Sequence, residues 1–129
     1  MAEHNDIGKI GENITDTFLK KNGFMIIERN YRTRYGEIDI IARKDNVLRF
    51  VEVKSVKVRD VLHIEGLAVK PEDNLTHAKW SKLVTSVGIY MQHRNINKGT
   101  SYQIDLACVY IDTETRQGRV KLLENVCKE

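Results

Sequence analysis

The chain has 129 residues, of which 41% are hydrophobic and 30% are charged, and its formal net charge is +3. This length and composition predict one globular domain, and they exclude a disordered chain and a protein of two domains. No apolar run approaches the ~20 residues that cross a bilayer, and no signal peptide opens the chain, so we expect a cytoplasmic protein outside the membrane.

Several classes of site find no support in the sequence. Cys108 and Cys127 are the only cysteines and form no C-x-x-C pair, while the four histidines are scattered without the spacing of metal ligands. No phosphate-binding glycine loop or dinucleotide fingerprint is present. We therefore expect neither a zinc site nor a nucleotide cofactor.

The chain begins with a segment of helical periodicity. Its apolar residues at three- and four-residue spacing are Ile7, Ile10, Ile14 and Phe18. This spacing predicts an amphipathic helix over residues 7–22. We expect Asn5 or Asp6 to cap its start and Gly23 to follow its end.

Three strands follow the predicted helix. Segments rich in β-branched and aromatic residues predict strands at about 24–34, 37–43 and 47–55. Asp45 and Asn46 lie between the second and third of these, and both residue types tolerate turn geometry. The second and third strands should therefore form a hairpin.

The second half of the chain predicts a loop, a helix and two strands. Residues 56–75 contain the only proline and carry no clear periodicity, which indicates a long loop or insertion. Strands are expected at 102–111 and at about 119–123. The apolar stripe of a second helix consists of Trp80, Leu83, Val84, Val87, Tyr90 and Met91. This order of elements predicts an α/β fold in which helices flank a mixed sheet.

The predicted hairpin contains charged residues among apolar ones. Because side chains alternate along a strand, Leu48, Phe50, Glu52 and Lys54 should share one face, with Val51 and Val53 on the other. On the preceding strand, Glu37 and Asp39 should share a face opposite Ile38, Ile40 and Ala42. If the two strands pair across the turn, Asp39 and Glu52 come close together.

Two adjacent carboxylates need a compensating interaction. At ~4 Å their repulsion is about 4 kcal/mol in a surface-like dielectric, and burial adds to that cost. A hard divalent cation such as Mg²⁺ relieves it, and Lys54 is near enough to orient a metal-bound water or to neutralise a phosphate. The alternative is a set of structural ion pairs. For any single acid taken alone we prefer the ion pair, because ion pairs within sheets are common, whereas for the whole set of acids with Lys54 we prefer the cation site.

Basic residues are concentrated in the same region. Nine basic and six acidic residues lie between Glu28 and Asp60, so the whole net charge can be placed there. This excess suits a polyanionic partner such as nucleic acid. The alternative is that these lysines and arginines merely solvate the edges of strands.

The N-terminal part of the chain resembles a known family. Asp39 and the run Glu52-Val53-Lys54 match the D…(D/E)-x-K signature of the restriction-endonuclease-like, or PD-(D/E)xK, nuclease superfamily. The longer stretch "GKIGENITDTFLKKNGFMIIERNYRTRYGEIDIIARKDNVLRFVEVKS" closely resembles the opening of the YraN-like family of that superfamily, which is related in fold to archaeal Holliday-junction resolvases. The resemblance implies a three-layer α/β/α core with a mixed central sheet flanked by helices.

The resemblance also implies roles for particular residues. Asp39 and Glu52 would be ligands of Mg²⁺ or Mn²⁺, with the Val53 carbonyl completing the shell. Glu12 would add a carboxylate beside the metal, and Lys54 would orient the attacking water. Glu37 belongs to the family's pattern either as an acid behind the ligands or as a charge at the strand edge. The candidates for contacts with nucleic acid are Arg32, Arg34, Lys57 and Lys79.

The chain departs from the family pattern at two places. Residues 56–75 form a long segment where the family has a short connection. Gln103 stands where relatives carry an arginine shortly before an aspartate, here Asp105. Both departures affect the expected contacts with substrate.

Three functional hypotheses follow from these observations. The first is a metal-dependent nuclease acting on DNA, with branched or structured DNA suggested by analogy of fold. The second is a nucleic-acid-binding module on the same fold that cleaves nothing. The third is a structural protein that forms a homodimer through a sheet edge or the helix that contains Trp80.

Overall fold

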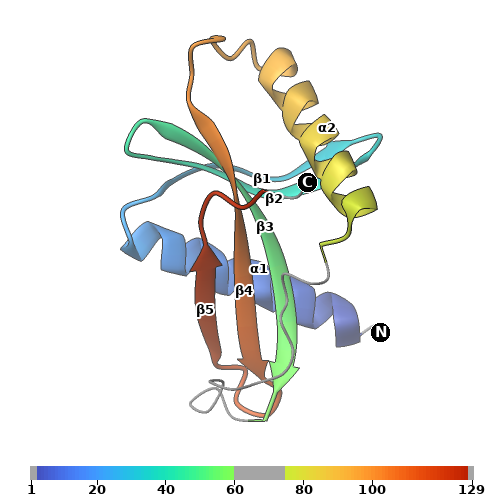
Figure 1. Cartoon of the computed structure of the whole chain (residues 1–129). Helices are drawn as coiled ribbons and strands as arrows, with labels where there is room; N and C mark the ends of the chain where they lie inside the picture. Colours follow the sequence, from blue (N-terminus) through green and yellow to red (C-terminus); the bar gives the residue numbers. More distant parts are fainter. Residues whose placement is uncertain (1–2, 60–74, 128–129) are drawn as a thin grey trace.

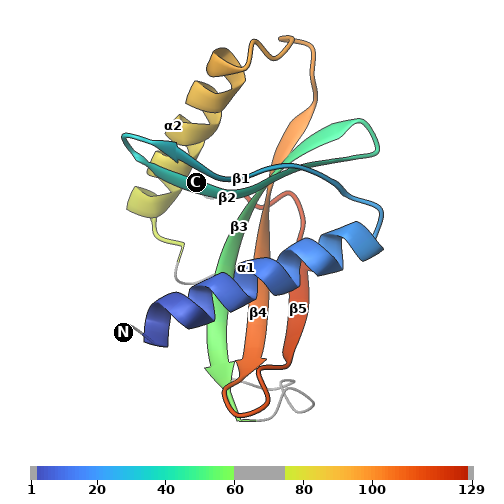
Figure 2. The same ribbon diagram turned by 180° about the vertical axis from the view of Figure 1, so that it is seen from behind.

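The protein is a five-stranded sheet between two helices. A computed structural model of the chain describes residues 3–59 and 75–127. Its elements are α1 (Glu3–Lys21), β1 (Met25–Thr33), β2 (Gly36–Lys44), β3 (Val47–Val58), α2 (His77–His93), β4 (Tyr102–Asp112) and β5 (Gly118–Leu123). The strands follow the order β1-β2-β3-β4-β5, in which only β3 and β4 are parallel. Figures 1 and 2 show α1 on one face of the sheet and α2 on the other, so the predicted three-layer mixed architecture is confirmed.

Helix α1 begins earlier than the sequence predicted. It starts at Glu3, so Asn5 and Asp6 lie within it and the prediction that either residue caps its start was wrong. The predicted end is confirmed, because Gly23 adopts a φ of +85° directly after the helix. A left-handed residue at this position suits glycine and allows the following N–H, that of Phe24, to bond to the Leu19 carbonyl at 3.0 Å.

The β2–β3 hairpin closes as predicted. Asp45 and Asn46 have φ angles of 55° and 61°, as a two-residue turn between antiparallel strands requires. Strand β3 runs to Val58 and so takes in the first residues of the segment predicted as a loop. The part of that prediction from 60 to 74 lies outside the described residues.

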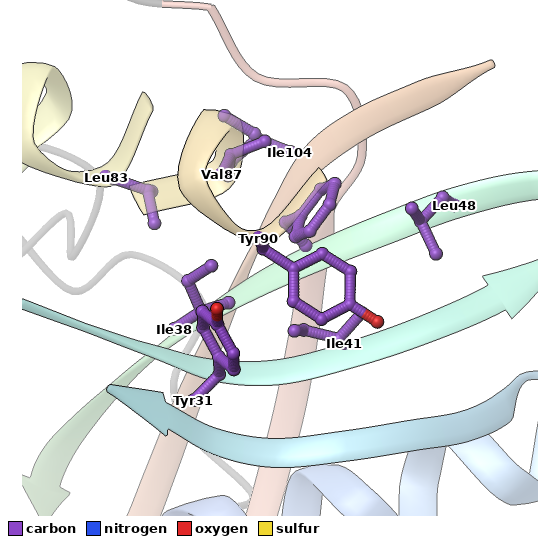
Figure 3. Packing of buried hydrophobic residues seen from close by; sticks show 9 residues of the cluster. Tyr31, Ile38, Ile41, Leu48, Leu83, Val87, Tyr90 and Ile104 are labelled. Carbon is purple, nitrogen blue, oxygen red and sulfur yellow. The ribbon is translucent and has the colours of Figure 1, made fainter. Parts of the chain in front are cut away.

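The two faces of the sheet carry separate apolar cores. The core under α2 consists of Tyr31, Ile38, Ile41, Leu48, Phe50, Leu83, Val87, Tyr90 and Ile104, most of which Figure 3 shows. The largest core under α1 consists of Leu19, Phe24, Ile40, Ala42, Val51 and Ala107. The stripe predicted for α2 is confirmed at Leu83, Val87 and Tyr90, but Val84 was wrongly included and is 43% exposed.

Strand β2 changes its facing pattern at Asp39. Ile38 packs under α2 whereas Ile40 packs under α1, so the prediction that both share a face was wrong. The paired register of β2 with β3 ends at Ile40 and Val51. Beyond that pair β2 leaves the regular ladder, while β3 stays paired with β4 on its other side as far as Val58. A gap therefore opens between β2 and β3 next to Asp39.

Helix α1 lies very close to β3 at one point. A Cβ atom added to Gly11 would overlap the Ser55 hydroxyl group and would lie 3.2 Å from the Ser55 Cβ. Thr15 is buried one turn further on and donates its hydroxyl hydrogen to the Gly11 carbonyl at 2.8 Å. Gly8, by contrast, has no atom within 4 Å of the position of its missing Cβ.

A buried ion pair joins the middle of the sheet to the C-terminal segment. The Arg49 guanidinium contacts Asp105 at 3.3 Å and Glu124 at 2.8 Å, and the Asp105 side chain is fully buried. Gln103 stands at the position where relatives carry an arginine, and its side-chain amide donates to Asp105 at 2.8 Å. The Asn125 N–H also donates to Asp105, at 2.9 Å. These bonds give Asp105 a structural role.

Neither α1 nor α2, the helices within the described ranges, has an apolar stretch long enough to cross a membrane.

Candidate functional site

The gap between β2 and β3 is occupied by the Asp39 carboxylate. Its Oδ2 accepts a hydrogen bond from the Val53 N–H at 2.8 Å. This N–H lies just beyond the last paired residues of the two strands, so the carboxylate replaces the strand carbonyl that would otherwise accept there. Because the N–H and C=O groups of a strand residue point to the same edge, the Val53 carbonyl also faces this gap.

Glu52 meets Asp39 across the same gap, as predicted. The two side chains share a hydrogen bond, which requires a proton on one of them. Burial, together with the neighbouring Asp39, raises the pKa of Glu52 to about 9. The pKa of Asp39 is also raised, chiefly by burial. The pair therefore holds a proton at neutral pH when no cation is bound.

Two further carboxylates converge on Asp39. Oxygen atoms of Glu12, Glu37 and Asp39 all lie within 4.8 Å of one another, and all three residues are half-buried. The Asn30 side-chain amide donates to Glu12 at 2.8 Å and to Glu37 at 2.6 Å. Asn30 has a φ of 54°, a conformation that asparagine tolerates better than most residues. It thus holds the acid of α1 and the acid of β2 side by side.

Arginines on β1 balance part of this negative charge. Arg29 approaches Glu12 at 3.6 Å and donates to Asn13 at 2.9 Å. Arg32, one of the predicted contacts for nucleic acid, pairs with Glu37 at 3.4 Å. Four carboxyl groups, with one proton shared by Asp39 and Glu52, face two arginines here, and Arg29 also pairs with Asp16 at 3.6 Å, so the acids keep an excess of negative charge.

The acids lie between two hollows in the surface. The larger hollow, of about 570 Å³, is lined by Glu12, Asp39, Val53, Lys54 and Lys57 among others. The smaller hollow, of about 160 Å³, is lined by Tyr35, Glu37, Glu52, Lys79 and Lys82 among others. Lys54 and Lys57 therefore stand on one side of the acids, and Lys79 stands on the other.

The ligand set suits a hard divalent cation. Its donors are carboxylate oxygens and the Val53 carbonyl, and among the described residues no histidine or cysteine joins the cluster. Oxygen donors are those that Mg²⁺ and Mn²⁺ prefer, whereas Zn²⁺ favours nitrogen and sulfur. A cation would also stabilise several half-buried, negatively charged carboxylates at this spacing more than water does.

The structure brings together all the acids singled out from the sequence. Glu12, Glu37, Asp39 and Glu52 meet at the gap, and Lys54 lines the adjoining hollow. The Arg34 guanidinium lies 5.7 Å from the centre of the Tyr35 ring. Sequence reasoning assigned no role to Asn30 or Lys82. Asn30 was singled out only as one of the residues that fit the pattern of the resembled family, and no signal in the sequence pointed to Lys82.

Comparisons with known proteins identify related chains. The model of a family described as "Uncharacterised protein family UPF0102" matches residues 11–109. A UPF0102 protein of Campylobacter lari is 37% identical over 117 residues, which cover 90% of this chain and 88% of the relative. UPF0102 proteins of Helicobacter hepaticus and Clostridium botulinum are 37% and 33% identical, each covering 92% of the relative and 92% and 93% of this chain. The matched region contains all four acids and Lys54.

Proposed function

The chain belongs to the UPF0102 family, and we propose that this protein is a metal-dependent nuclease that hydrolyses phosphodiester bonds in DNA. The observation that carries the proposal is the Asp39 carboxylate in the strand gap, bonded to Val53 N–H and to Glu52, with Glu12 and Glu37 alongside. Such a concentration of acids is costly to a fold unless a cation binds there.

The cation would be held by Asp39, Glu52 and the Val53 carbonyl, with Glu12 beside it. A bound Mg²⁺ or Mn²⁺ supplies charge stabilisation at the phosphate and lowers the pKa of a bound water. Asp39 can bind a cation through the oxygen that does not accept the Val53 N–H, and this hydrogen bond fixes the orientation of the carboxylate. Glu52 must release its proton before it can bind, so cation affinity should rise with pH.

Lys54 would be the lysine that acts on the substrate. It lines the same hollow as Asp39 and Glu12. Its ammonium group would stabilise negative charge on the phosphate and hold the attacking water in line with the bond to be broken. Water attacks phosphorus, the bond to the leaving oxygen breaks, and that oxygen takes up a proton.

A calorimetric titration with Mn²⁺ tests the cation site directly. We expect the wild type to bind Mn²⁺ and Asp39→Asn to lose binding by at least about tenfold. Asp45→Asn is the matched control, because it makes the same change of charge in the β2–β3 turn, where asparagine suits the φ of 55°. Cleavage of single-stranded, duplex and branched DNA in Mn²⁺ then tests the reaction.

The outcomes separate the hypotheses. Binding of Mn²⁺ by Asp39→Asn at wild-type strength, or by neither protein, would exclude the nuclease. DNA binding that persists without cleavage under all conditions would favour the non-catalytic binding module. A difference in size between Asp39→Asn and the wild type on gel filtration, with neither Mn²⁺ binding nor DNA binding, would favour the homodimer.

A further inference from the structure

The smaller hollow lies on the α2 side of the acids and has a composition of its own. It is lined by Tyr35 and Gly36 of the β1–β2 hairpin, by Glu37 and Glu52 of the acid cluster, and by the α2 residues Lys79, Lys82, Leu83 and Ser86. An aromatic ring, two amines and two of the acids thus share one cavity. Its volume of about 160 Å³ is below the roughly 300–1,000 Å³ of pockets for drug-sized ligands. Its size therefore suits a small group, such as a single base, and not a drug-sized ligand.

The tip of the β1–β2 hairpin is fixed against α2. The Thr33 hydroxyl donates to the Gly36 carbonyl at 3.1 Å and accepts the Tyr35 N–H at 3.0 Å. The hydroxyl of the buried Ser86 lies 2.7 Å from the Thr33 hydroxyl oxygen. These bonds hold the backbone of Tyr35 in place while its side chain remains 44% exposed. A large aromatic side chain presented in this way has a surface available for stacking.

The two amines of α2 lie where a phosphate would need them. Lys79 and Lys82 are three residues apart, so they lie on neighbouring positions of the helix surface, and both are exposed. Among the described side chains, those of residues 7–59 and 75–127, no carboxylate forms an ion pair with either amine. The first turn of α2 contains no acidic residue. The described side chains therefore leave both amines without an ion-pair partner, although Glu37 and Glu52 line the same hollow.

We infer that the smaller hollow binds one unpaired nucleotide next to the phosphate that is cleaved. The base stacks on Tyr35, and the neighbouring phosphate contacts Lys79 and Lys82. The strand then crosses the acids toward Lys54 and Lys57 in the larger hollow. This inference rests on the proposed nuclease function and specifies its substrate as DNA whose strand is unpaired at the cleavage site, because a base within a duplex has no exposed face to stack.

Binding measurements test the inference without relying on cleavage. All variants are made in Asp39→Asn, which removes one acid and under the proposed function cannot cleave. Fluorescence anisotropy follows binding of three fluorescein-labelled probes of one sequence: a single strand, a continuous duplex, and a duplex with a splayed end. We expect the single strand and the splayed duplex to bind more tightly than the continuous duplex.

Substitutions at the hollow then identify the contacts. Tyr35→Ala should weaken binding of the single strand about tenfold, the contribution of one base–aromatic stack, and should leave the continuous duplex unchanged. Tyr35→Phe should restore binding, because the ring and not the hydroxyl makes the stack. Lys82→Gln should lower the dependence of log K on log salt by about 0.7, and Lys98→Gln, an exposed lysine beyond the other end of α2, should not.

The failure of this inference can be told apart from failure of the nuclease proposal. Equal affinity for all three probes, no binding to any of them, or equal losses for Tyr35→Ala and Tyr35→Phe would overturn the nucleotide site. None of these results bears on Mn²⁺ binding by the wild type. Absence of that Mn²⁺ binding would overturn the nuclease, whatever the anisotropy shows.

Discussion

The Glu52 carboxyl group has a pKa of about 9 instead of 4.5 because it is buried beside Asp39. In the unfolded chain the group releases its proton near the lower value, whereas in the folded, cation-free protein it keeps the proton up to the higher value. The folded state therefore binds more protons than the unfolded state between about 4.5 and about 9. Stability supplied by this group is present at low pH and is lost as the pH rises through that interval.

We predict that Glu52→Gln removes this pH dependence. In the presence of EDTA, the melting temperature of the wild type should fall relative to that of Glu52→Gln as the pH is raised from about 5 to about 9. Circular dichroism at a series of pH values measures the difference. Saturating Mn²⁺ should reverse the trend for the wild type alone, because the cation binds the deprotonated carboxylates. A constant difference between the two proteins would show that Glu52 titrates normally.

Individual residues also show where sequence reasoning reaches its limit. The meeting of Asp39 and Glu52 followed from strand alternation and the Asp45–Asn46 turn, because both are local properties. The bridge that Asn30 makes between Glu12 and Glu37 depends on three elements meeting, and no periodicity encodes it. Glu12 was predicted at the site only through resemblance to a family.

At the scale of elements, the contact between α1 and β3 fixes the position of Glu12. Gly11 is next to Glu12 in sequence, and it packs against Ser55, which follows the Glu52-Val53-Lys54 run on β3. The helix can approach this closely only because residue 11 has no side chain. Any increase in the separation of the two elements carries Glu12 away from Asp39.

We predict opposite effects for alanine at two glycines of α1. Gly11→Ala should reduce the free energy of unfolding by about 1–3 kcal/mol, because its methyl group overlaps Ser55. Gly8→Ala is the matched control and should raise it by about 0.5–1 kcal/mol, since its Cβ meets no atom and alanine favours helix. Urea unfolding measures both. Combining Gly11→Ala with Ser55→Gly should recover part of the loss, and no recovery would show that the strain arises elsewhere.

The elements were predicted well where the sequence pattern was regular, and less well where the structure departs from that pattern. The five strands, the hairpin turn and the end of α1 followed from alternation, turn residues and Gly23. The facing of Ile38 and Ile40 did not, because a strand irregularity at Asp39 breaks the alternation on which the prediction depended. This irregularity opens the gap for the carboxylate, so the prediction was wrong at the candidate site itself.

At the scale of the whole molecule, Arg49 ties the centre of the sheet to the end of the chain. It joins β3 to Asp105 on β4 and to Glu124 beyond β5, and its side chain is only 8% exposed. The guanidinium also lies 5.3 Å from the centre of the Phe24 ring, at the entrance to β1. Removing it leaves the fully buried Asp105 with no positive partner among the described residues, where its other partners are the neutral donors of Gln103 and Asn125.

We predict that Arg49→Met destabilises the protein by about 3–5 kcal/mol, because it leaves a buried charge without its partner. Arg94→Met is the control: Arg94 forms an ion pair with Glu28 at 2.8 Å, but on the surface, so its loss should be much smaller. Equilibrium unfolding in urea gives both values. Similar losses for the two variants would mean that Asp105 takes up a proton or finds another partner. If the unpaired charge causes the loss, adding Asp105→Asn to Arg49→Met should restore part of the stability.

The arrangement of β2 and β3 also bears on the order in which the protein acquires its structure. Asp39 and Glu52 lie on one hairpin closed by a two-residue turn, and hairpins form within about 1–10 μs. The parallel partner of β3 is β4, which begins at Tyr102, so that pairing must close a long loop and is intrinsically slower. Two of the proposed cation ligands can therefore meet early during folding, before the slow step is complete. Mn²⁺ present from the start of refolding would then accelerate the wild type more than Asp39→Asn.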